Sequence, residues 1–101
     1  MLVAIDKKGD ILIVKIVGAI DNDAAKTLRF ELAEIAAQKP SQVVLDLSQV
    51  PAMGSIGIGN ILMFFKTLQG FNACFEINGI HEDLYPFFKT TKLDRLFPIS
   101  Q

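Results

Sequence analysis

The chain has 101 residues, half of them hydrophobic, and a formal net charge of −1 at pH 7. This length suits one domain with its own core, so we expect a single domain over residues 1–101. The charge balance offers no basic face for nucleic acid, and no apolar run approaches the roughly 20 residues of a membrane helix. Because the first residues also lack the pattern of a signal peptide, we expect a cytoplasmic protein without direct membrane insertion.

The composition also argues against most catalytic and metal sites. Cys74 is the one cysteine and His81 is the one histidine. These two residues cannot supply a disulfide framework, a CxxC metal site or a His-rich centre, and a Ser-His-Asp triad would depend on His81 alone. We therefore expect no enzymatic activity, no metal and no cofactor. Cys74 lies in an apolar segment, which predicts a buried and inert thiol.

The first half of the chain predicts a hairpin followed by a helix. Residues 2–5 and 11–17 are apolar and rich in β-branched side chains, and a short polar segment with a glycine separates them, as in an antiparallel pair. Apolar residues then recur at helical spacing up to Gln38. Asp21 or Asn22 can cap this helix.

The second half continues the alternation of strands and helices. Residues 43–47 predict a central buried strand, and residues 55–68 predict a long helix that Gly70 ends in a left-handed conformation. The remaining elements are a strand at 73–77, helices near 82–88 and 93–96, and a short edge strand near 97–99. The order β-β-α-β-α-β-α predicts an α/β sandwich with a mixed sheet of four to five strands and about four helices.

The long helix carries apolar side chains beyond one core stripe. Met63 and Phe64 lie off the predicted stripe, so they either form a docking patch for another protein or are covered by the first helix or the C-terminal segment. The sequence leaves both readings open. The stripe itself consists of Ile58, Ile61, Leu62, Phe65 and Leu68.

Ser55 stands between two glycines at the start of this helix. Serine is favoured there for capping alone, which is worth about 1 kcal/mol. Asp21 and Asp46, however, each follow a β-run, and both runs can finish at the edge where the helix begins. A phosphoryl group on Ser55 would add a charge of about −1.5 to −2 near these carboxylates. Asp46 also has a simpler interpretation, as a cap for the turn that follows it.

Four segments in this order resemble the STAS domain of bacterial anti-sigma factor antagonists. Together they cover essentially the whole chain, and the resemblance implies a STAS-like sandwich. The segments are Gly18–Ala25, which enters the first helix, Val43–Val50 in the central strand, Gly54–Gly59 at the start of the second helix, and the tail Leu93–Ile99.

The resemblance also implies a function based on partner switching. In that family a kinase that is also the anti-sigma factor phosphorylates the serine, and a phosphatase reverses the modification. By position, Ser55 is the expected phosphoacceptor, with Asp21 and Asp46 as its acidic neighbours. The expected partners are an anti-sigma factor of the GHKL-type serine kinase class and a PP2C-type phosphatase, and a weak homodimer is a further expectation. The expected docking surface consists of Gly54, Ser55, Ile56, Gly57, Asn60, Met63 and Phe64.

The chain departs from the family pattern beside the serine. Gly54 stands where the family has aspartate, and Ile56 stands where it often has a second hydroxyl. Two functions therefore remain: a non-enzymatic regulator controlled by phosphorylation at Ser55, or a constitutive STAS docking subunit of a regulatory scaffold or lipid-transport ABC assembly that is not phosphorylated.

Overall fold

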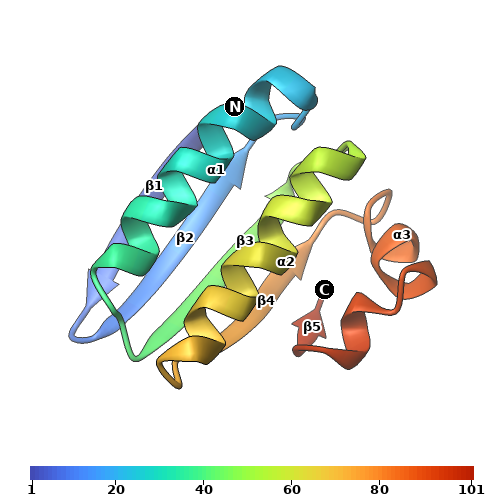
Figure 1. Cartoon of the computed structure of the whole chain (residues 1–101). Coiled ribbons are helices and arrows are strands. Elements are labelled where there is room, and N and C mark those ends of the chain that lie inside the picture. The colour runs from blue at the N-terminus through green and yellow to red at the C-terminus, as the bar shows by residue number, and fades with distance from the viewer.

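A five-stranded mixed sheet forms the centre of the protein in a computed structural model that describes residues 1–101 (Figure 1). The strands lie in chain order, and the predicted order of elements and α/β class are confirmed. The strands are β1 (Leu2–Lys8), β2 (Ile11–Val17), β3 (Gln42–Gln49), β4 (Cys74–Ile80) and β5 (Ile99–Ser100). The helices are α1 (Asn22–Ala37), α2 (Ser55–Gly70), α3 (Tyr85–Thr90) and a 3₁₀ turn at Leu93–Arg95.

The hairpin of β1 and β2 is the antiparallel part of the sheet. Its register runs from Leu2 opposite Val17 to Lys8 opposite Ile11, and Gly9 turns the chain with a φ of +62°. β1 therefore continues three residues beyond the predicted strand. These residues are charged and exposed, as an edge strand allows, because the ladder uses main-chain groups and leaves their side chains in water. All other strand pairs are parallel.

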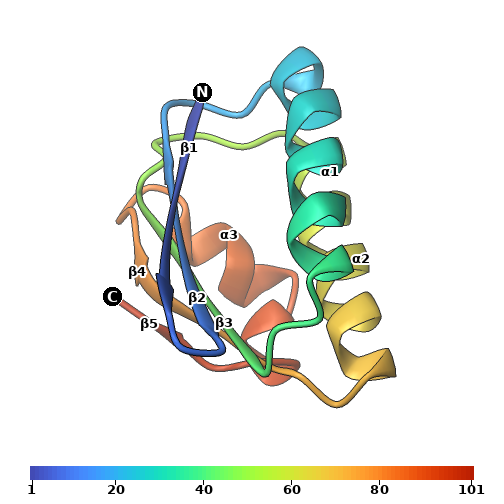
Figure 2. The same ribbon diagram turned by 90° about the vertical axis from the view of Figure 1, so that its left-hand side faces the viewer.

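α1 and α2 cover one face of the sheet, and Figure 2 shows no helix on the other face. The strands therefore alternate between buried and more exposed side chains, as expected for a sheet covered on one side. Cys74, at the start of β4, is exposed. The prediction of a buried thiol is wrong, because Phe75 takes the core position and Cys74 lies on the alternate, uncovered face.

Four phenylalanine rings join α2, β4 and the C-terminal tail. The Phe64 and Phe75 rings meet edge to face with centroids 5.7 Å apart, and the Phe75 and Phe97 rings lie 4.9 Å apart. Phe65 packs against Phe97 at 5.2 Å. The Phe64 side chain is only 4% exposed, so of the two readings the structure supports the one in which neighbouring elements cover it, and Phe64 does not belong to an exposed patch. The buried arc of α2 is wider than one stripe because α1, as well as the sheet, packs against it.

Three helix boundaries differ from the prediction. α2 continues through Gly70, and Asn72 takes the left-handed conformation with a φ of +62°, which asparagine tolerates. α3 begins at Tyr85 because a turn precedes it, in which the Leu84 amide donates to the His81 carbonyl at 2.9 Å. The fourth predicted helix is a short 3₁₀ turn that follows Lys92, whose φ is also +62°.

None of the helices combines the length and the apolar character needed to cross a bilayer. The structure also contains no group of three or more His, Cys, Asp or Glu residues that could hold a metal ion.

Replacing Phe64 by alanine should destabilise the protein by about 3 to 5 kcal/mol, because it leaves a cavity among packed aromatic rings. Met63 is a matched control on the same helix, since its side chain is 64% exposed. Met63→Ala should change the free energy of unfolding by no more than about 1 kcal/mol. Urea unfolding of both variants measures the difference, and similar losses would contradict the burial of Phe64.

Replacement by alanine should change the stability of the protein in opposite directions at two glycines of α2. A Cβ on Gly59 would meet no atom within 4 Å, so Gly59→Ala should stabilise the protein by about 0.5 to 1 kcal/mol. A Cβ on Gly57 would lie 2.7 Å from Met53 Cγ and 3.1 Å from Ile20 Cγ2. Gly57→Ala should therefore cost about 1 to 2 kcal/mol. Thermal unfolding of the two variants tests this, and a stabilising Gly57→Ala would refute the close packing.

Candidate functional site

The loops that follow β2 and β3 are hydrogen-bonded to each other. The Gly18 amide donates to the Gln49 carbonyl at 2.9 Å, and the Ile20 amide donates to the Ala52 carbonyl at 3.0 Å. The Gly54 amide in turn donates to the Ile20 carbonyl at 3.0 Å. This parallel pairing extends beyond the strands, so α1 and α2 begin beside each other (Figure 1).

The two helices begin with different caps. Asp21 caps α1, because its Oδ1 accepts a hydrogen bond from the Ala24 amide at 2.8 Å. The choice between Asp21 and Asn22 is thereby decided. Gly54 is the N-cap of α2 and has no side chain to accept such a bond. The first amides of α2 therefore have no side-chain cap, and this end keeps its partial positive charge.

Ser55 is the first residue of α2, so it is not the cap. The residue is exposed, and its hydroxyl takes part in no hydrogen bond with another protein group. The interpretation of Ser55 as a capping serine is therefore wrong. The structure leaves its Oγ free for another molecule.

Asp21 directly follows Ile20, whose carbonyl accepts the Gly54 amide, and its own carboxylate caps α1. The neighbouring Asn22 places its Oδ1 3.1 Å from the position that a Cβ on Gly54 would take. A larger residue at position 54, such as the aspartate of the family pattern, would require this amide to move. Asn22 thus occupies the space that is available because residue 54 is glycine.

Asp46 lies on the other face of the sheet, contrary to the expectation that it neighbours Ser55. Leu45 and Leu47 on either side of it are buried beneath the helices, so the Asp46 side chain points away from α2. Its Oδ1 accepts a hydrogen bond from the Ser48 amide at 2.9 Å, as the simpler interpretation predicts. A Cβ on Gly79 would lie 2.7 Å from the same oxygen, and Gly79 has a φ of +101°.

The structure divides the predicted docking residues between the surface and the core. Ser55, Ile56 and Met63 are exposed, Gly54 and Asn60 are partly buried, and Gly57 and Phe64 are buried. The accessible residues continue along one side of α2, where Ile56, Asn60, Met63 and Thr67 follow one another at intervals of four, three and four residues.

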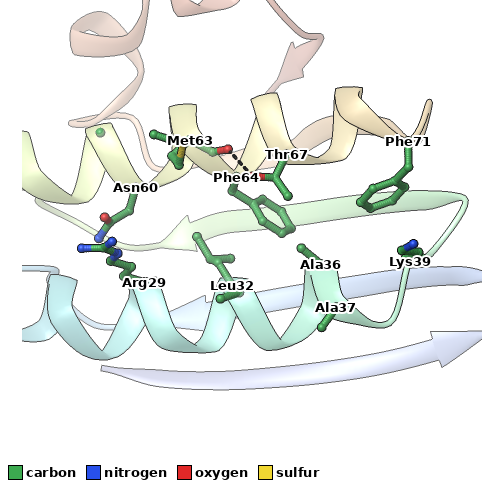
Figure 3. A pocket seen from close by; sticks show the side chains of 12 residues that line it. Arg29, Leu32, Ala36, Ala37, Lys39, Asn60, Met63, Phe64, Thr67 and Phe71 are labelled. Atoms are coloured by element: carbon green, nitrogen blue, oxygen red, sulfur yellow. Dashed lines mark hydrogen bonds between the residues drawn. The ribbon is translucent and has the colours of Figure 1, made fainter.

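A groove between α1 and α2, about 650 Å³ in volume, adjoins this row. Figure 3 shows Phe64 and Leu32 from opposite helices inside it, with Arg29 beside Asn60 at one end and Lys39 near Phe71 at the other. The Asn60 amide donates to the Ala25 carbonyl at 2.7 Å and links the two helices. This groove was not among the features predicted from the sequence. The sequence feature that could have indicated it is a set of small side chains on one side of α1: Ala33, Ala36 and Ala37.

Solved structures of several other proteins, anti-sigma factor antagonists among them, share this fold. The anti-sigma factor antagonist from Mycobacterium paratuberculosis is 23% identical, with a TM-score of 0.88 over 97% of this chain and 83% of the other. A protein from Thermotoga maritima is 18% identical, with a TM-score of 0.91 over 98% of this chain and 86% of the other.

The anti-sigma factor antagonist SpoIIAA has the same fold in two chemical states. Its unphosphorylated form is 13% identical to this chain, with a TM-score of 0.83 over 99% of this chain and 89% of SpoIIAA. Its phosphorylated form from Bacillus has a TM-score of 0.76 over 99% of this chain and 92% of SpoIIAA.

The family model described as the STAS domain matches residues 3–101, which is the whole chain except its first two residues. The chain therefore belongs to the STAS domain family.

Proposed function

We propose that this protein is a non-enzymatic partner-switching regulator of the anti-sigma factor antagonist type. It binds an anti-sigma factor of the GHKL-type serine kinase class in the cytoplasm, and phosphorylation of Ser55 ends this binding. The observation that carries the proposal is the free, exposed hydroxyl of Ser55 at the first residue of an uncapped helix. SpoIIAA, with the same fold, exists in phosphorylated and unphosphorylated forms.

The exposed side chains near Ser55 suit contact with a protein. Ile56, which follows the serine, is 49% exposed, and Met63 lies two turns further along the same side of α2. An exposed isoleucine and methionine beside a polar serine can be buried by a partner without leaving a charge unpaired. The unmodified form is therefore the binding form.

Phosphorylation would change both the charge and the size of this surface. The phosphoryl group adds a charge of about −1.5 to −2, which the uncapped amides at the start of α2 stabilise. In an interface the same charge would be buried against a partner that fits the neutral serine, at a cost of about 2 kcal/mol or more. A PP2C-type phosphatase would restore the binding form.

A constitutive docking subunit is the second candidate, and Gly54 favours it. The position next to Ser55 has no carboxylate to orient a kinase, and the Asn22 amide occupies the adjacent space. In that case the same surface binds a scaffold or a transport assembly without modification.

Mass spectrometry of the protein purified from its native cells distinguishes these functions. The proposed regulator should show a phosphoryl group of about 80 Da on Ser55, which phosphatase treatment removes. Protein that stays unmodified at Ser55 in every growth condition would reject the switch and favour the constitutive subunit.

Ser55→Asp should weaken binding of the partner kinase by about 30-fold, the equivalent of about 2 kcal/mol, while Ser55→Ala should retain it. The measurement is pull-down from native-cell lysate with quantification of the GHKL-type kinase. Thr27→Asp, at an exposed position within α1, controls for added charge and should have no effect. Equal binding by the two Ser55 variants would contradict a switch at this residue.

A further inference from the structure

The groove between α1 and α2 combines an apolar floor with two basic ends. Leu32, Ala36 and Phe64 form its floor, and exposed Met63 stands at its rim. Arg29 and Lys39 are the charged residues that line it, and no aspartate or glutamate does so. This excess of positive charge is local, since the whole chain carries a net charge of −1.

Both cations are available to another molecule. Neither Arg29 nor Lys39 takes part in a salt bridge, since the one close approach of a basic nitrogen to a carboxylate joins His81 and Asp83. Arg29 and Lys39 are exposed. An anionic group at either end of the groove would therefore meet a cation that has no competing partner within the chain.

The separation of the two cations indicates the shape of the ligand. Arg29 lies within α1, and Lys39 lies two residues past its end. The eight residue steps from position 29 to position 37 rise about 12 Å along the helix, so the two basic ends are more than two helical turns apart. A fatty acid or similar amphiphile has one charged head and would satisfy one end. An amphipathic helix of about three turns can place an acidic residue at each end of an apolar stripe.

We infer that the groove binds an amphipathic α-helix of the partner protein, with an apolar stripe on the groove floor and an acidic side chain at each end. The small side chains of Ala33, Ala36 and Ala37 allow the helix to approach α1 closely. The groove is continuous with the Ser55 surface through Asn60 and Met63, so this inference rests on the proposed function for the identity of the partner. The exposed residues Ser55 and Ile56 then provide the switch, and the groove recognises the side chains of the partner helix.

Helical peptides test the chemistry without the partner. One stapled peptide of about 14 residues carries a leucine stripe with glutamate at both ends, and the other carries lysine at both ends. Fluorescence anisotropy should show the glutamate peptide binding at least about tenfold more tightly than the lysine peptide, with a difference that shrinks at high salt. The double variant Arg29→Glu, Lys39→Glu should reverse this preference. Lys66→Glu, on the same pair of helices but outside the groove, should preserve it.

Three outcomes would overturn the inference. One is equal binding of both peptides, or absence of binding, by the wild-type protein. Another is displacement of the glutamate peptide by palmitate, which would assign the groove to an amphiphile. The third is concentration-dependent self-association that the double variant abolishes, since this would make a second copy the occupant.

The experiment also separates the groove from the switch. Loss of the partner kinase in Ser55→Asp, with full retention in the charge-reversal double variant, would reject the groove and leave the proposed function intact. If the peptide preference reverses as expected while Ser55 is never modified, the groove is supported and the switch is rejected.

Discussion

The hydrogen bonds between the loop after β2 and the loop after β3 hold the first turns of α1 and α2 together. The Ile20 carbonyl accepts the Gly54 amide, and the Ile20 side chain is buried where Gly57 brings α2 close. One residue thus fixes both the backbone and the packing at the start of α2. The position of Ser55, the exposure of Ile56 and the spacing of the helices that form the groove all follow from this contact.

Much of the fold could be predicted because local patterns and tertiary structure agree. The hairpin, the limits of α1 and the crossover order follow from β-rich segments, a capping aspartate and helical periodicity. Phe64 could not be placed, because periodicity gives the direction of a buried stripe but not its width, which depends on α1. The sequence was sufficient to predict which face of the sheet Asp46 lies on, since the apolar Leu45 and Leu47 alternate with it along β3. The prediction placed Asp46 on the wrong face because it assumed that a residue near a strand end points toward the following helix.

The candidate site depends on a difference between two adjacent helices. α1 begins with an aspartate cap and a further acidic residue, Asp23, so its first amides already meet negative charge. α2 begins with glycine and has no acidic residue in its first turn. An added anion is therefore accommodated at α2 more readily than at α1. Glycine at position 54 removes a carboxylate that could orient a kinase, yet it also leaves the positive end of the helix free for a phosphoryl group.

The uncovered face of the sheet carries a single site for covalent labelling. Cys74 is the single cysteine of the chain, is exposed, and alternates along β4 with buried Phe75, so it lies on the face of the sheet opposite α1 and α2. A maleimide dye or spin label attached there would be unique in the molecule and separated by the sheet from both the Ser55 surface and the groove. Residue 74 begins a strand that runs beneath α2, so a probe at this thiol reports on the rotational diffusion of the whole rigid domain. Partner exchange can thus be followed in real time on protein whose helical surface is unaltered.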